Sequence, residues 1–137
     1  MNSKLSWDGK MGFSACGDSG HLVKIDVNTE NGGQDSGARP MELILHGLGG
    51  CSGADVVSII KKMKMDLQSL TIEITGKRAE DHPRRFTDIH LIYRFSGTDI
   101  DPEKAKRAIE LSHTKYCSVA GSLNANLTYE LVIERTA

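Results

Sequence analysis

The chain has 137 residues, enough for one domain with a hydrophobic core and too few for two domains of ordinary size. Hydrophobic residues make up 39% and charged residues 26%, as in ordinary globular proteins. The formal net charge of −1 argues against a general role on nucleic acid or at a membrane surface, because both roles need an excess of Lys and Arg. We therefore expect a single domain over residues 1–137, with no nucleic-acid and no membrane partner.

The first predicted elements are three strands of a meander over residues 4–27. Asp8-Gly9 is typical of a two-residue hairpin turn, and residues 17–20, Gly-Asp-Ser-Gly, mark a second turn. Residues 28–39, NTENGGQDSGAR, have no periodicity and many turn formers. They predict a loop over the surface or over a site.

Residues 36–64 combine the longest apolar run, the densest glycine cluster and one cysteine, Cys51. Two local structures fit this stretch. In one, Pro40 opens a single long helix at its first position, and Cys51 lies in the middle of that helix. In the other, residues 41–46 form a buried strand and residues 47–53 form a glycine loop before a shorter helix. The choice decides which chemistry Cys51 can support.

A second antiparallel strand pair follows. Apolar residues alternate along both strands, at Leu70, Ile72 and Ile74 and then at Ile89, Leu91, Tyr93 and Phe95. The charged stretch GKRAEDHPRR between them carries both signs and fits a solvated hairpin connection.

A second helix begins at Asp101-Pro102, an N-cap followed by proline at the first helical position. One face of this helix carries Ala105, Ala108, Ile109, Ser112 and Tyr116. Cys117 ends the helix or begins a short one, and alternation over residues 127–133 predicts a last strand. The order β-β-β-α-β-β-α-β indicates an α+β fold with mainly antiparallel sheet.

The residues around Cys51 match two functional loops only in part. Residues 49–53 fit a G-x-C-x-G nucleophile elbow, but an α/β-hydrolase needs βαβ units where this chain has hairpins. Residues 47–52 lack the third glycine of a dinucleotide-binding loop. In the single-helix alternative each glycine costs roughly 1 kcal/mol relative to alanine. We would then expect the helix to be buried on most sides, its glycines allowing close packing against another helix or a second subunit.

The three cysteines, Cys16, Cys51 and Cys117, are odd in number and widely spaced. This pattern suits neither a secreted disulfide framework nor a CxxC metal site, so we expect no metal and no cofactor. Residues 1–10 lack the apolar core of a signal peptide, and no window reaches about 18 unbroken apolar residues. We expect a cytoplasmic protein, in which such cysteines are buried small hydrophobes or reactive thiols.

Two cysteine motifs far apart in the chain form a more specific pattern. PMELILHGLGGCSGADVV contains Pro40, Glu42, Leu43 and Cys51, and YCSVAGSL downstream contains Cys117. Together they resemble the OsmC family of osmotically inducible and organic hydroperoxide resistance proteins, in the branch with PMEL and LGGC motifs. The resemblance runs along essentially the whole chain. It implies an intertwined homodimer in which antiparallel sheets wrap a long buried helix, and it therefore favours one helix from Pro40.

The resemblance also implies a function in oxidative stress defence. Cys51 would attack the O–O bond of an organic hydroperoxide as a thiolate and become a sulfenic acid. Cys117 would resolve the sulfenic acid as a disulfide, which an external dithiol would reduce. The expected partners are a small-molecule hydroperoxide, a dithiol reductant and a second copy of the chain, and the expected catalytic residues are Cys51, Cys117 and Glu42.

The chain departs from the family pattern in the groups that activate the cysteine. The peroxidase branches pair an arginine from the N-terminal strands with a glutamate directly after the proline, whereas here no arginine precedes Arg39 and Met41 follows the proline. Lys10 or Arg39 is the candidate cation, although Lys lacks the guanidinium fork. Asp55, one helical turn after Cys51, disfavours a thiolate unless it is paired.

These departures keep a second function open, namely a binding or redox-sensing module that retains the fold and the cysteines but not the peroxidase activity. It would take an apolar ligand or form a reversible disulfide. His113, one turn before Cys117, is a candidate base or a surface residue. Glu42 is either a site residue or a first-turn carboxylate favoured by the helix dipole. Cys16 is expected to be structural.

Overall fold

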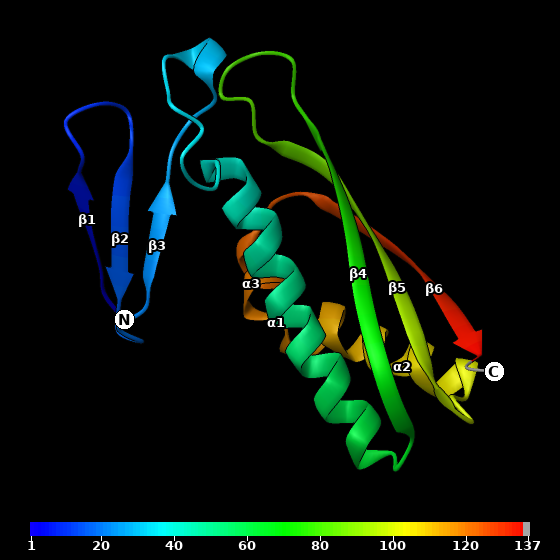
Figure 1. The fold of residues 1–137 in the computed structure, drawn as a ribbon. Coiled ribbons are helices and arrows are strands. Elements are labelled where there is room, and N and C mark those ends of the chain that lie inside the picture. The colour runs from blue at the N-terminus through cyan, green and yellow to red at the C-terminus, as the bar shows by residue number, and fades with distance from the viewer. Residues whose placement is uncertain (136–137) are drawn as a thin grey trace. The chain divides into compact units, whose positions relative to one another are not determined.

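The computed structural model describes residues 1–135, which form two compact units (Figure 1). The first unit comprises residues 1–46, and the second begins at Gly47. The long helix α1 (Pro40–Lys62) starts in the first unit and continues into the second. We describe the two units separately.

The first unit is built on the predicted three-stranded meander. Its strands are β1 (Ser3–Trp7), β2 (Phe13–Gly17) and β3 (Leu22–Ile25), paired antiparallel in the order β1-β2-β3. The prediction of a two-residue turn at Asp8-Gly9 was wrong, because residues 8–12 all lie between the first two strands.

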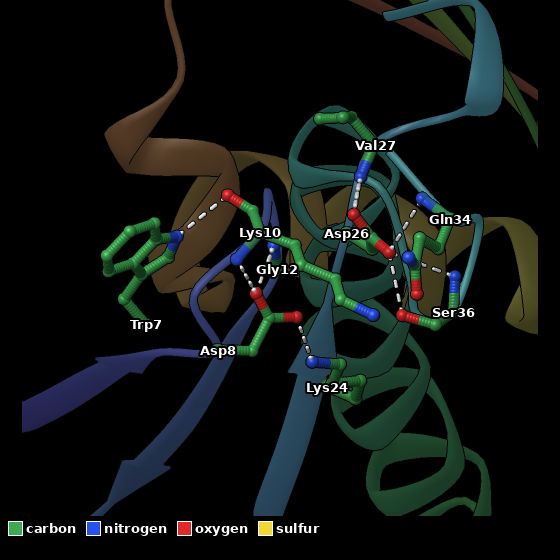
Figure 2. Close-up of polar contacts among 9 residues, drawn as sticks. All are labelled: Trp7, Asp8, Lys10, Gly12, Lys24, Asp26, Val27, Gln34 and Ser36. Carbon is green, nitrogen blue, oxygen red and sulfur yellow. Dashed lines mark hydrogen bonds and ion pairs between the residues drawn. The ribbon is translucent and has the colours of Figure 1, made fainter. Parts of the chain in front are cut away.

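The Asp8 carboxylate explains the longer turn. It accepts the backbone N–H groups of Lys10 at 2.7 Å and Gly12 at 3.1 Å, and it forms an ion pair of 2.9 Å with Lys24 Nζ (Figure 2). The indole N–H of Trp7 donates to the Lys10 carbonyl at 2.8 Å. These bonds satisfy backbone groups that a tighter hairpin would have paired across the strands.

The loop after β3 is ordered around one carboxylate, that of Asp26, which is 2% exposed. Asp26 accepts the N–H groups of Val27, Gln34 and Ser36 and, at 2.6 Å, the Ser36 hydroxyl (Figure 2). The Ser36 hydroxyl is the largest of the causes that lower the pKa of Asp26 to about 2. The predicted loop is therefore fixed by hydrogen bonds, and it contains one short 3₁₀ turn, η1 (Thr29–Asn31).

The pairing register places most of the apolar residues of this sheet on one face, with Leu22 on the other. Opposed residues point to the same side of a sheet, and the opposed sets are Leu5–Ala15–Val23 and Trp7–Phe13–Ile25. Four of its large side chains remain exposed, from 37% at Phe13 to 65% at Trp7. We call these six residues the apolar face of the first unit.

The second unit contains a three-stranded sheet of β4 (Asp66–Arg78), β5 (Phe86–Thr98) and β6 (Asn126–Arg135). β4 and β5 pair antiparallel, as predicted, but β6 pairs parallel with β5. The prediction of antiparallel sheets was wrong for this pair. The helical segment between β5 and β6 returns the chain to the end of the sheet at which β5 begins, as a parallel crossover requires.

Helix α1 is continuous from Pro40 to Lys62, so Cys51 lies in mid-helix and the nucleophile-elbow alternative is excluded. Added Cβ atoms at Gly49 and Gly53 would lie 2.7 Å and 3.2 Å from Ile74 Cδ1 and Ile72 Cδ1 of β4. These two glycines permit close packing, as predicted, but against a strand of the sheet.

The predicted burial of α1 on most sides is not found within this chain. Its buried residues are Leu48, Ser52, Val56 and Ile60, one per turn along a single stripe. By length and composition alone α1 could cross a membrane, a criterion that the core helix of a soluble protein also meets.

The connection between β5 and β6 is helical throughout. It consists of α2 (Pro102–Leu111), a π-helical turn η2 (Ser112–Tyr116) and α3 (Ser118–Ser122) (Figure 1). The Asp101 side chain caps α2 by accepting the Glu103 N–H at 2.9 Å. The predicted buried face is present from Ala105 to Ser112, but Tyr116 is 50% exposed. The π-helical turn changes the helical phase after Ser112.

Candidate functional site

Cys51 and Cys117 meet in the second unit. Cys51 lies in mid-α1 and Cys117 lies between η2 and α3, and the two residues approach to 3.3 Å. Both are free thiols, and Cys117 is 6% exposed while Cys51 is partly exposed. A disulfide bond of about 2.05 Å therefore needs only a small movement of the two side chains.

Asp55 is the third acidic group of this cluster. Its carboxylate and the two Sγ atoms all lie within 4.8 Å of one another. Asp55 takes part in none of the ion pairs formed by residues 1–135. The groups nearest to the thiols are thus acidic, which disfavours two simultaneous thiolates.

Asp55 is instead held by a hydrogen-bonded chain of side chains that crosses the unit. Ser112 Oγ lies 3.0 Å from Asp55 Oδ2 and 2.9 Å from Ser52 Oγ. Ser52 Oγ lies 2.6 Å from the Tyr93 hydroxyl, which lies 2.8 Å from Nε2 of His113. Helix α1, η2 and strand β5 all contribute to this chain.

The Ser112 hydroxyl is the donor to the Asp55 carboxylate in this hydrogen-bonded chain. Ser112 has a single hydroxyl proton, and a carboxylate is a stronger acceptor than a hydroxyl, so Ser112 donates to Asp55. Ser112 Oγ is also the donor toward Ser52, so its one proton lies between the two acceptors. The Ser52–Tyr93 and Tyr93–His113 bonds can each run in either direction. Among the described residues, no buried side-chain N or O atom lacks a hydrogen-bond partner. The network is therefore complete.

Burial favours the neutral forms of three members of this site, Tyr93, His113 and Cys117. Desolvation raises the pKa of Tyr93 to about 12 and lowers the pKa of His113. Desolvation is also the largest cause that raises the pKa of Cys117. At neutral pH the phenol, the imidazole and the Cys117 thiol are uncharged, so a reaction of Cys117 needs a group that accepts its proton.

Two thiols and a carboxylate are also donors that Zn²⁺ accepts. A closed structural zinc site needs four ligands, however, and no fourth Cys, His, Asp or Glu donor joins the three anywhere in the described part of the chain. The Ser112 hydroxyl already occupies one carboxylate oxygen of Asp55. We therefore treat the three groups as acids that exchange protons and assign no metal to them.

The other residues expected at the site lie in the first unit. The Glu42 carboxylate is 3.8 Å from Nε of Arg39, an exposed ion pair. Lys10 donates its backbone N–H to Asp8 in the β1–β2 turn, and Cys16 lies in β2 opposite Lys4. The cations predicted to activate Cys51 thus have their described contacts within the first unit.

Sequence reasoning missed Ser52, Tyr93 and Ser112 as members of the site. All three are fully buried, and two of them were assigned to apolar faces. A hydroxyl on an otherwise apolar face must find a partner, and this is the signal that would have identified Tyr93 and Ser112. Nothing in the local sequence distinguishes Ser52 from the glycines around it.

Both the sequence and the fold are similar to those of known proteins. The family of OsmC-like proteins matches residues 33–132. Protein YhfA of Escherichia coli K12 is 36% identical over 136 residues, covering 96% of this chain and 98% of that protein. A hypothetical protein from Aquifex aeolicus is 30% identical with a TM-score of 0.80, covering 97% of this chain and 96% of the other. The organic hydroperoxide resistance protein OhrB of Bacillus subtilis has a TM-score of 0.64 at 20% identity, covering 96% and 98%, and so shares the fold. The chain belongs to the family of OsmC-like proteins.

Proposed function

We propose that this chain is a thiol-dependent peroxidase that reduces organic hydroperoxides in oxidative stress defence. The observation that carries the proposal is the approach of Cys51 and Cys117, 66 residues apart in sequence by their numbers, to 3.3 Å as free thiols. Hydroperoxide resistance in the names of structural relatives supports the substrate class.

The reaction uses the two thiols in sequence. Cys51 sulfur bonds to one peroxide oxygen, the O–O bond breaks, and the thiol proton passes to the alkoxide, which leaves as an alcohol. Cys117 sulfur then bonds to Cys51 sulfur, the S–O bond breaks, and the hydroxide leaves as water. An external dithiol reduces the disulfide by thiol exchange and restores both thiols.

The test is the consumption of cumene hydroperoxide by purified protein with excess dithiol. Cys51→Ser should abolish turnover, and Cys117→Ser should stop at one equivalent of hydroperoxide with a sulfenic acid on Cys51. Cys16→Ser is the matched control and should turn over like the wild type, because Cys16 lies in β2 outside the cluster. Undiminished turnover in Cys51→Ser would refute the proposal.

The second candidate function is a redox-sensing or ligand-binding module. It is favoured by the position of Asp55, which places a carboxylate beside the two thiols. This function predicts that hydroperoxide converts the two thiols to a reversible Cys51–Cys117 disulfide, or that the protein binds an apolar ligand. It predicts no sustained consumption of hydroperoxide in the presence of dithiol. The turnover experiment separates the two functions.

The partner proposed for the chain itself is a second copy. The apolar face of the first unit leaves Leu5, Trp7, Phe13 and Val23 exposed, and α1 buries only one stripe within the chain. Exposed apolar surface of this kind marks an interaction surface. A homodimer in the cytoplasm would cover it and accounts for both observations.

Glu42 stays a predicted member of the catalytic set, through its pairing with Arg39. Glu42→Gln removes the charge and keeps the shape of the side chain. If the pair assists catalysis, this variant should slow the reaction of Cys51 with hydroperoxide, and Arg39→Gln should slow it equally. Asp35→Asn, which removes the other carboxylate beside Arg39, is the matched control.

A further inference from the structure

We propose that Asp55 accepts the proton of the Cys117 thiol when Cys117 attacks oxidised Cys51, and that the chain Ser112–Ser52–Tyr93–His113 positions its carboxylate for this transfer. The inference rests on the proposed function, which supplies the oxidised Cys51. It assigns a catalytic role to Asp55 and positioning roles to Tyr93 and the two serines.

The need for a proton acceptor follows from the surroundings of Cys117. Its side chain is buried, and burial raises the pKa of its thiol, yet only the thiolate attacks a sulfenic acid or a disulfide. Among the described residues, Cys51 and Asp55 cluster with it, and no His joins them. Asp55 is the one base in that cluster.

The transfer balances without another reactant. The Cys117 S–H bond breaks and its proton passes to Asp55 as the S–S bond forms. The S–O bond of the Cys51 sulfenic acid breaks, and Asp55 returns the proton to the leaving hydroxide, which departs as water. Distances within 4.8 Å are spanned by one hydrogen bond or by one bridging water, which is the reach of a general base.

The hydrogen-bonded chain explains how Asp55 keeps its orientation beside two acidic groups. The Ser112 hydroxyl is held between Asp55 and Ser52, and Ser52 is held in turn by the Tyr93 hydroxyl. The Tyr93 hydroxyl is bonded in turn to Nε2 of His113. Loss of the Tyr93 hydroxyl frees Ser52 to turn, and the donor to Asp55 is then no longer fixed.

The titratable groups that face Asp55 and His113 come from several elements packed against the site. Asp55 faces Cys51 on its own helix, Cys117 after η2, and the phenol of Tyr93 from β5. His113 faces the rings of Tyr93 and, from β6, Tyr129 at 5.3 Å. Tyr129 donates to Glu110 of α2 at 3.2 Å. The hydrogen-bonded chain of side chains ends at the neutral imidazole of His113, so these side chains add no charge beside Asp55.

The experiment measures the Cys117 step without a peroxide, in a Cys16→Ser background. A mixed disulfide of Cys51 with thionitrobenzoate releases coloured thionitrobenzoate when Cys117 attacks it. Asp55→Asn still accepts from Ser112 but cannot take a proton. At pH 7 it should slow this release by about 100-fold, the low end for loss of a general base, and the deficit should shrink as the pH rises.

Tyr93→Phe should slow the same step by less than Asp55→Asn does and should make its rate more dependent on pH. The matched control is Tyr129→Phe, which removes a hydroxyl next to His113 but outside the chain. It should leave the rate and the pH profile unchanged. For Asp55→Asn the control is Asp88→Asn, an exposed carboxylate of β5.

Equal rates and pH profiles in Asp55→Asn and the wild type would overturn the inference, and so would equal losses in Tyr93→Phe and Tyr129→Phe. A rate that is reduced by the same factor at every pH would also overturn the inference. Such a loss would indicate damage to the fold, because the effect of that damage does not depend on the hydroxide concentration. Because the assay contains no hydroperoxide, absence of peroxidase turnover would refute the proposed function alone.

Discussion

Asp26 and Asp55 are both partly or fully enclosed carboxylates, and their partners give them opposite roles. Asp26 accepts four hydrogen bonds from its own loop, three of them from backbone N–H groups. Asp55 has one hydroxyl donor and two thiols as neighbours. The first is locked in its ionised form as a loop organiser, whereas the second keeps an oxygen free to exchange a proton.

The pKa of Asp26, lowered from 3.8 to about 2, predicts acid sensitivity of the loop over residues 28–37. Because the folded state holds the ionised form, this stabilisation is complete above pH 3.8 and is lost as the pH falls toward about 2. Protease cleavage of this loop should therefore rise over that range. Asp26→Asn should be cleaved readily at neutral pH, and Asp18→Asn, in the β2–β3 turn, is the control.

The lowered pKa of His113 predicts a second acid-sensitive contribution. The unfolded chain takes up a proton near pH 6.5, whereas burial delays uptake in the folded state. The stabilisation is thus present above pH 6.5 and declines as the pH falls below it, through the lower folded value. Chemical denaturation from pH 8 to pH 5 should show this decline in the wild type and a smaller one in His113→Gln. An equal decline in both would contradict the assignment.

At the scale of elements, two features position the site: close packing of α1 on β4, and the π-helical turn η2 that follows α2. The glycines at 49 and 53 bring the helix against the sheet, so that Ser52 reaches Tyr93 on β5. The π-helical turn then presents Ser112 and His113 to the same network, and Cys117 follows directly. Neither feature is unusual by itself, but together they bring Cys51 and Cys117 close to each other.

Glycine substitutions test the packing of the sheet. A Cβ added at Gly76 of β4 would lie 2.5 Å from the Phe86 ring, so Gly76→Ala should lower the free energy of unfolding by about 1–3 kcal/mol. Gly121 of α3 has no atom within 4 Å of an added Cβ. Gly121→Ala should therefore leave stability unchanged or raise it by up to about 1 kcal/mol. Urea titrations of both variants give the comparison, and equal effects would contradict it.

At the scale of the whole molecule, the apolar face of the first unit and the incompletely covered α1 predict self-association. Sedimentation should show a dimer, and Trp7→Glu should weaken it by placing a charge in the contact. Trp7 is the single tryptophan and is 65% exposed, so its fluorescence should shift to the red on dilution as water returns to the indole. Lys4→Glu, on the opposite face of β1, is the control.

The sequence alone determined most of the local structure and identified the pair of cysteines that meet. Alternation, the Asp101 cap and Pro40 at a first helical position predicted the strands and helices, because these signals act over a few residues. The paired motifs indicated the family, and Cys51 and Cys117 stay the predicted catalytic residues. The interpretation of the glycines as packing positions holds for Gly49 and Gly53, which pack against β4, but not for Gly47 and Gly50, where an added Cβ has nothing within 4 Å.

Only the tertiary structure decided what surrounds the thiols. The parallel pairing of β5 and β6, the π-helical turn and the meeting of Asp55, Ser112 and Tyr93 depend on contacts between residues distant in the chain. A buried hydroxyl has the same local pattern whether its partner is a carbonyl or a catalytic network. Its partner is chosen by packing, and packing is a property of the folded chain as a whole.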